Sequence, residues 1–264
     1  MGRDLFQLSP GTRWLGRRLE VYAELDSTNL RAEELAARGA AEGTIVVADR
    51  QTAGRGRLGR SFFSPGGVGL YLSVVLRPTL PPDQTHAYVF VAALAVAREV
   101  AARVPGEVEI KWPNDVRIDR LKTSGINLSA RLDGSRVASL VLGIGVNVNT
   151  PAEAFPPELR TIATSLRAAG GRELERTAFA EQLLRRLEAE IDEFREGGLS
   201  PVLDQWRKFF RMAGSRVRIG GPGISHEIEG VVDGVDATGA LVLRTDRGTE
   251  RILAGDVTVL RGNA

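Results

Sequence analysis

The stretch SGINLSARLDGSRVASLVLGIGVNVN, residues 124–149, decides the fold class. It divides at Asp133-Gly134, a dipeptide that accepts the positive φ angles of a hairpin turn. The two halves are therefore expected to form a long antiparallel strand pair. Such a pair needs a sheet around it and helices over the sheet, so we predict an α+β fold with a mixed, mainly antiparallel sheet backed by helices.

Runs on both sides of the hairpin supply further strands and the covering helices. Short β-branched or apolar runs predict strands at residues 44–49, 69–78, 109–113 and 115–119. Amphipathic or wholly apolar runs predict helices at residues 30–40, 84–104, 178–194 and 200–212. The sequence DSTN at residues 26–29 offers N-cap side chains for the first of these helices.

The end of the chain has a different pattern. Short strand-like runs with turn glycines at close spacing follow Gly214, which is typical of a small β-barrel of about five strands. We therefore expect a domain boundary near residue 213, with a larger domain over residues 1–212 and the barrel over residues 213–264.

Composition excludes several classes of function. The chain has no cysteine, which excludes disulfides, thiolate zinc sites and cysteine nucleophiles and makes a reducing cytoplasm the expected location. Only His86 and His226 are present, so a histidine-rich metal site is excluded. The net charge is only +2, so any need for positive charge is local. No signal peptide and no membrane-spanning run is expected.

Positive charge gathers in the segment GRGRLGR, residues 54–60. A guanidinium binds phosphate oxygens through two parallel hydrogen bonds, and neighbouring glycines let backbone N–H groups approach the same anion. The segment therefore indicates a polyphosphate-binding loop, with a solvated basic loop as the alternative. The lysine and the Ser/Thr of a Walker A loop are missing, which excludes a kinase or GTPase site here.

Two further clusters carry polar groups that can serve a ligand. In KWPNDVRIDRLK, residues 111–122, a carboxylate and two ammonium groups surround a tight turn and can face one pocket. A purely structural turn is the alternative. In GIGVNVN, residues 143–149, glycines near a strand end leave room for a ligand, although they equally suit a β-bulge.

Together these motifs resemble the biotin protein ligase family, also called biotin-[acetyl-CoA carboxylase] ligase. The resemblance rests on DSTN, on QTA before GRGRLGR, on KWPND before KTSGI and on the late GIGVN, and it covers roughly residues 20–262. It implies a class II synthetase-like catalytic domain, a C-terminal SH3-like barrel and the form of the family without an N-terminal DNA-binding domain. It also implies that ATP, with Mg²⁺ on its phosphates, activates biotin, which then passes to a lysine of a biotin carboxyl carrier protein domain.

The resemblance implies a role for each matching residue. The expected catalytic residues are Arg55, Arg57, Asp115 and Lys122. Biotin is expected to contact Ser27, Thr28, Asn29, Gln51, Gly54, Arg55, Lys122 and Gly125. ATP is expected to contact Arg57, Arg60, Phe62, Lys111, Asn114 and Asn147. No side chain is expected to hold a metal ion, and Mg²⁺ is expected on the phosphates.

The chemistry explains why these residue types are needed. A carboxylate and a triphosphate repel each other, so arginines of the loop and Lys122 are expected to screen that repulsion and the charge on the departing pyrophosphate. The transfer step needs a neutral amine. Asp115 is the candidate to orient the incoming ammonium group and help remove its proton.

The segment KTSGINLS, residues 122–129, departs from the family pattern KxAGILxE. Ser124 replaces an alanine, Asn127 a leucine and Ser129 a glutamate. Polar groups beside the acid site need partners, or each costs about 1–3 kcal/mol when buried. The shape or polarity of the acid pocket is therefore expected to differ from the family pattern.

Two other functions stay open on the sequence. Lipoate ligases and octanoyltransferases share the fold, but their RRxxGGG-type loop is absent. A nucleic-acid-binding module would use residues 54–60, the arginine loop, together with the barrel and would need no catalysis. However, no aromatic residues alternate with the arginines, and the net charge of the chain is low. A homodimer is open, and neither DNA nor a membrane is an expected partner.

Overall fold

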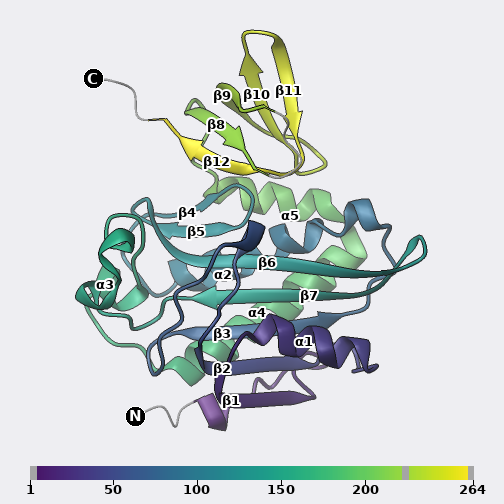
Figure 1. Ribbon diagram of the computed structural model, residues 1–264, viewed down its shortest axis with the longest axis vertical. Helices are drawn as coiled ribbons and strands as arrows, with labels where there is room; N and C mark the ends of the chain where they lie inside the picture. Colours follow the sequence, from purple (N-terminus) through teal and green to yellow (C-terminus); the bar gives the residue numbers. More distant parts are fainter. Residues whose placement is uncertain (1–4, 222–225, 261–264) are drawn as a thin grey trace.

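The larger part of the molecule is built on a seven-stranded mixed sheet. The structure is a computed structural model that describes residues 5–221 and 226–260. The sheet has the order β1-β2-β3-β7-β6-β5-β4 (Figure 1), and β1 and β2 are its one parallel pair within the described residues. The predicted mixed, mainly antiparallel sheet is confirmed. Its strands are β1 (Leu19–Leu25), β2 (Ile45–Gln51), β3 (Leu70–Leu76), β4 (Val108–Lys111), β5 (Asp115–Ile118), β6 (Leu121–Asp133) and β7 (Arg136–Val146).

Helices cover both faces of this sheet. In Figure 1, α1 (Thr28–Ala37) lies in front of the sheet, and α2 (Ala87–Ala101) and α4 (Arg176–Gly197) lie behind it. The chain also forms the short α3 (Leu166–Gly170) and α5 (Leu199–Trp206). Because both faces of β3 are covered, all its residues are buried, which explains its almost continuous apolar sequence. None of the helices in the described ranges is both long and apolar enough to cross a membrane.

The long hairpin that decided the fold class is confirmed. Strands β6 and β7 pair antiparallel from Ser124 opposite Val146 to Asp133 opposite Arg136. Gly134 has a φ of 59° at the turn, a conformation that glycine adopts without steric cost. The hairpin therefore forms where the Asp-Gly dipeptide placed it.

Some elements differ from their predicted bounds. The predicted helix 84–104 begins at Ala87, after a separate 3-10 turn over Pro82–Gln84. The predicted helix 200–212 ends at Trp206, and a 3-10 turn over Arg207–Phe209 follows it. Strand β1 was not predicted, because it is an edge strand whose glutamates at positions 20 and 24 interrupt any apolar pattern.

The C-terminal part is a five-stranded antiparallel sheet in the order β11-β10-β9-β8-β12. The expected number of strands is therefore confirmed, while the boundary at residue 213 stays a prediction. The strands are β8 (Arg216–Gly220), β9 (Ile228–Val235), β10 (Leu241–Thr245), β11 (Gly248–Ile252) and β12 (Asp256–Val259).

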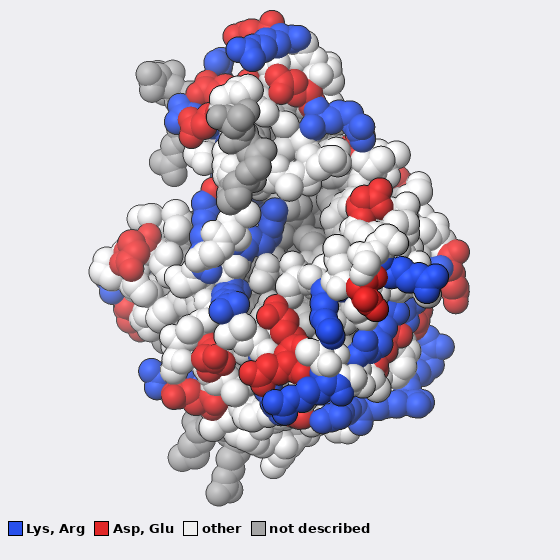
Figure 2. All heavy atoms as spheres, turned by 45° about the vertical axis from the view of Figure 1, so that its right-hand side comes forward, with Lys and Arg blue, Asp and Glu red and all other residues white. Residues whose placement is uncertain are grey.

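Side chains of the larger part bond to backbone carbonyls of the C-terminal part. The Trp112 indole N–H donates to the Gly239 carbonyl over 2.9 Å, in a buried position. His86 Nε2 lies 2.7 Å from the Thr238 carbonyl oxygen. Figure 2 shows a hollow below the C-terminal sheet, with Lys and Arg side chains along its border.

Candidate active site

A bare patch of sheet lies on the face that α1 partly covers. Gly145 on β7 pairs with Tyr71 on β3 and with Gly125 on β6. One step along the same face, Gly143 pairs with Ser73 and Asn127 on the same two strands. Directly paired residues point to the same face of a sheet, so the glycines leave space between larger side chains.

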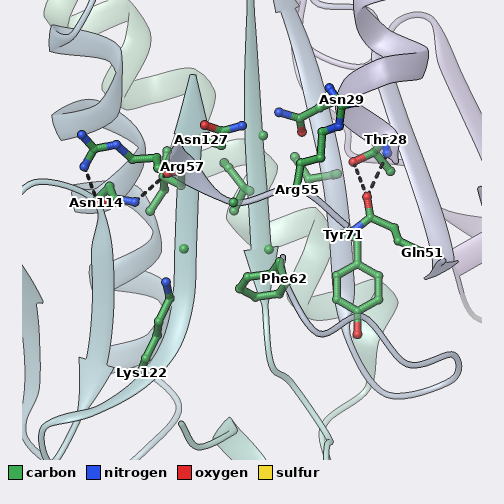
Figure 3. Close-up of a pocket in the computed structure, with 17 residues that line it drawn as sticks. Thr28, Asn29, Gln51, Arg55, Arg57, Phe62, Tyr71, Asn114, Lys122 and Asn127 are labelled. Atoms are coloured by element: carbon green, nitrogen blue, oxygen red, sulfur yellow. Dashed lines mark hydrogen bonds between the residues drawn. The ribbon is translucent and has the colours of Figure 1, made fainter. Parts of the chain in front are cut away.

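Side chains of other elements surround that space as a cavity (Figure 3). It holds only about 40 Å³, roughly the volume of one water molecule. The cavity is lined by Thr28, Asn29, Gln51, Arg55, Gly56, Arg57, Phe62, Tyr71, Leu72, Asn114, Lys122, Gly125, Ile126, Asn127, Gly143, Ile144 and Gly145.

Three cationic side chains from two separate segments line this one cavity. Arg55 and Arg57 come from the arginine loop, and Lys122 comes from the start of β6. The Arg57 guanidinium donates to Asn114 Oδ1 over 3.0 Å, which holds it beside the Trp-Pro-Asn turn. Burial lowers the pKa of Arg57, and the nearby carboxylates Asp115 and Asp256 oppose that effect. The three cationic residues therefore line one cavity, as the motifs predict.

Lys122 is held by an ion pair at the edge of the cavity. Its Nζ lies 2.7 Å from Asp115 Oδ1, and both side chains are partly exposed. Asp115 itself is not among the residues that line the cavity. Its carboxylate thus orients the ammonium group of Lys122 in this state.

The opposite end of the cavity carries a chain of polar contacts. Gln51 Oε1 accepts hydrogen bonds from the Thr28 backbone N–H at 2.8 Å and from its hydroxyl at 3.1 Å. The Gln51 amide donates to Ser64 Oγ at 2.9 Å. The Ser73 hydroxyl lies 2.8 Å from Thr28 Oγ1 and 2.7 Å from Asn29 Oδ1. Thr28 and Gln51 are thus already satisfied by their neighbours.

Phe62 lies directly on the glycine floor, the patch of sheet formed by Gly125, Gly143 and Gly145. A Cβ added to Gly145 would stand 2.7 Å from the Phe62 ring, and one added to Gly125 would stand 3.5 Å from it. The ring also meets Tyr71 edge to face, with centroids 6.3 Å apart. The two glycines are therefore what allows an aromatic side chain to reach the floor.

Five other predicted site residues do not line the cavity. Ser27 has a buried hydroxyl without a partner, and it does not cap α1 with its side chain. Gly54 is packed against Phe62 and Ser64, where a Cβ would stand 2.6 Å from each. Lys111 is half-buried, and its ammonium group makes no hydrogen bond within the described residues. Their proposed roles in ligand binding stay predictions.

Arg60 and Asn147, the other two predicted site residues outside the cavity, bond to other parts of the protein. Arg60 points to the C-terminal sheet, where its guanidinium forms a two-pronged pair with Asp256. Asn147 is buried and its amide donates to the Thr164 carbonyl at 3.0 Å. The structure thus gives both residues a role in holding segments together, and their predicted contacts with ATP stay untested.

Several lining residues were missed or given no role from the sequence. Tyr71 lines the cavity, and Ser73 lies just behind Thr28 and Asn29; both belong to a run that was predicted as a strand and given no role in the site. A lone serine within the apolar run LYLSVVL was the available signal, because a buried hydroxyl needs partners.

Of the three residues that depart from the family pattern, two have hydrogen-bond partners for their side chains and one has none among the described residues. Ser124 Oγ donates to the Gly145 carbonyl at 2.7 Å, and Ser129 Oγ donates to Glu33 Oε1 at 2.6 Å. Both hydroxyls therefore avoid the expected cost of burial. Asn127, in contrast, lines the cavity and its carboxamide hydrogen-bonds to no other described residue.

Lys111 leads to a prediction about stability and pH. Burial lowers its pKa below 10.5, with Arg117 and Lys122 adding to the effect and Asp115 and Asp256 opposing it. The unfolded chain thus binds more protons than the folded one just below pH 10.5, so stability should rise with pH through this window. We expect Lys111→Met to raise the midpoint of thermal unfolding at pH 7 by about 2–4 °C. The unfolding midpoint of this variant should also increase less between pH 7 and pH 10.5 than the midpoint of the wild type.

Thermal unfolding measured from pH 7 to pH 11 by circular dichroism checks this expectation. Lys208→Met is the matched control, because Lys208 is an exposed lysine on the 3-10 turn. An unchanged midpoint in Lys111→Met, or the same change in both variants, would contradict the assigned burial effect.

No group of three or more metal-ligating side chains occurs among the described residues.

A larger hollow of about 650 Å³ lies between α2, α4 and the C-terminal sheet. Its cationic residues Arg77 and Arg195 already bond to carbonyl groups and to Glu42. The cavity on the glycine floor is therefore the candidate active site.

Comparison with known proteins identifies the class of protein. A family model described as the biotin/lipoate A/B protein ligase family matches residues 21–147, and one described as the biotin protein ligase C terminal domain matches residues 214–260. Fold, cavity and matches together define a ligase of the biotin/lipoate class.

Individual relatives narrow the class. The bifunctional ligase/repressor BirA of Bacillus subtilis is 36% identical over 246 residues, which are 93% of this chain and 75% of the relative. The biotin–[acetyl-CoA-carboxylase] ligase of Mycobacterium tuberculosis is 36% identical over 96% of this chain and 92% of its own. A solved biotin protein ligase from Aquifex aeolicus, in complex with biotin and ATP, has a TM-score of 0.78 at 30% identity and covers 93% of this chain and 100% of its own. The chain belongs to the biotin protein ligase family.

Proposed function

We propose that the chain activates biotin with ATP and transfers it to a lysine of a carrier protein domain. In the first step, a carboxylate oxygen of biotin attacks the α-phosphorus of ATP, and pyrophosphate leaves. In the second step, the lysine nitrogen attacks the acyl carbon of the adenylate, AMP leaves and the nitrogen loses a proton. An amide bond to the carrier results.

The observation that carries the proposal is that Arg55, Arg57 and Lys122 all line one cavity. Two anions must approach each other in the first step, so cations between them lower the barrier most where charge builds up on the phosphates. Charge-assisted hydrogen bonds of this kind contribute about 1.5–3 kcal/mol each. Lys122, held by Asp115, is suited to contact both the carboxylate and the phosphate that replaces it.

The other end of the cavity suits the ring system of biotin. Thr28, Asn29 and Gln51 present amide and hydroxyl groups there, while the Phe62 and Tyr71 rings supply apolar surface. The protein offers no cluster of metal ligands within the described residues, so Mg²⁺ would enter on the phosphates of ATP.

The direct test is ATP–pyrophosphate exchange with biotin, lipoate and octanoate in parallel. We expect exchange with biotin that exceeds exchange with either other acid by at least about 100-fold, since a site built for hydrogen bonds rejects an acid without them. Exchange with lipoate but not biotin would overturn the substrate. Absence of exchange with all three acids would overturn the reaction.

Transfer is tested separately. A carrier domain with one acceptor lysine should gain one biotinyl group, seen by mass spectrometry, and the same domain with that lysine changed to arginine should gain none. Modification of the arginine variant at other lysines would show release of a free adenylate rather than specific transfer.

A further inference from the structure

Two carboxamides face each other across the glycine floor. Asn29 comes from the first turn of α1 and Asn127 from β6, and both line the cavity. Figure 3 shows their side chains directed toward one another above β7. A Cβ added to Gly143 would stand only 2.2 Å from Asn29 Oδ1, so the absence of a side chain at this position lets Asn29 occupy the space.

Both carboxamides have hydrogen-bonding capacity left over. Asn29 is only 5% exposed, and its Nδ2 is buried with no hydrogen-bond partner. The Asn127 carboxamide makes no hydrogen bond to another residue in the described ranges. A buried amide donor without a partner costs about 1–3 kcal/mol, so a ligand that supplies an acceptor here recovers that cost.

The neighbouring polar groups cannot supply those partners. Thr28 and Gln51 bond to each other, and the Ser73 hydroxyl is shared between Thr28 and Asn29. Two amides together offer both donors and an acceptor to whatever lies between them. An alkyl chain would leave all of these groups unsatisfied, whereas a cyclic urea brings one carbonyl acceptor and two N–H donors.

We propose that Asn127, with Asn29, is a specificity-determining residue that recognises a cyclic urea at the far end of the acid substrate. The inference rests on the proposed activation of biotin, whose bicyclic ring contains such a urea, and deepens it. It assigns to Asn127 a direct contact with the substrate. It also assigns to the chain a stricter selection against alkyl acids than an apolar residue at this position would give.

The experiment compares wild-type protein with Asn127→Leu in pyrophosphate exchange. Its substrates are biotin and desthiobiotin, which keeps the urea and lacks the sulfur, and octanoate is added as a competitor. We expect the variant to raise KM for biotin and desthiobiotin by the same factor of about three to ten, the effect of one neutral hydrogen bond, with kcat nearly unchanged. The inhibition constant of octanoate should fall, because leucine extends the apolar wall.

Ser129→Ala is the matched control, since Ser129 lies two residues further along β6 and bonds to Glu33 outside the cavity. It should change neither KM nor the inhibition constant. Thermal unfolding should show that each variant is folded, and Asn127→Ala serves as a second variant if the leucine one is not.

The outcomes separate this inference from the proposed function. If the wild type exchanges with biotin and Asn127→Leu leaves both KM values and the octanoate constant unchanged, the role of Asn127 is overturned alone. A rise in KM for biotin but not for desthiobiotin would also overturn it, because the contact would then be to the sulfur. If the wild type shows no exchange with biotin, the proposed function falls and this inference with it.

Discussion

Lys122→Ala is expected to slow adenylate formation about 100-fold while leaving the protein folded. The lysine is the cation best placed to stabilise charge on both reacting groups, and loss of one such donor costs about 2.7–4 kcal/mol at the transition state. The fold should tolerate the change because both partners of the Lys122–Asp115 pair are partly exposed, and exposed pairs contribute about 0–1 kcal/mol. Pyrophosphate exchange and thermal unfolding measure the two effects separately.

Lys208→Ala controls for the loss of a lysine as such. Lys208 lies on the 3-10 turn after α5, where its Nζ donates to Gln205. This control should keep the wild-type exchange rate. Full exchange by Lys122→Ala would show that the lysine does not act in the first step, whatever its position.

Asp115→Asn is expected to separate the two half-reactions. Asparagine keeps an oxygen that can accept a hydrogen bond from Lys122, so exchange should fall less than about tenfold. Transfer to the carrier should fall about 100-fold, because the amide cannot take a proton from the incoming ammonium group and general bases contribute about 10²–10⁴. Single-turnover transfer from preformed adenylate measures the second step alone.

Raising the pH distinguishes two roles for Asp115. If the carboxylate removes the proton, transfer by Asp115→Asn should recover toward the wild-type rate as the acceptor lysine deprotonates near its ordinary pKa of about 10.4. If Asp115 only positions Lys122, both half-reactions should fall by the same factor and the loss should persist at high pH. That second pattern would contradict the role of proton acceptor.

Much of the fold could be predicted because the signals are local. The hairpin of β6 and β7 follows from a dipeptide that accepts a positive φ angle, and Gly134 adopts it. Helix α2 is apolar nearly all round because it packs between the sheet and two other helices. Edge strand β1 gave no such signal, since its two glutamates face solvent at least in part.

The candidate site could be predicted as a set of motifs, but its geometry could not. The glycine and arginine motifs name residues that meet in the cavity, yet sequence does not tell in which direction a loop side chain points. Arg60 therefore reaches Asp256 of the C-terminal sheet although its neighbours Arg55 and Arg57 face the cavity. Asn147 turns to a buried carbonyl for the same reason.

The floor of the cavity depends on register, which is a property of the whole sheet. Gly125 and Gly145 lie opposite each other only because the hairpin pairs them, and Ser73 meets Asn29 only because β3 lies beside β7. These contacts join residues far apart in the chain. A single sequence gives the residue types but not these pairings.

The central claim is that Arg55, Arg57 and Lys122 bind one pair of reacting anions, and a crystal structure with a non-hydrolysable biotinyl-adenylate analogue tests it most directly. We expect the phosphate or its replacement within hydrogen-bond distance, about 3 Å, of Lys122 Nζ and of at least one of the two guanidinium groups. We also expect the cyclic urea beside Asn29. An analogue bound with its phosphate group away from all three cations would contradict the assigned role of these cations.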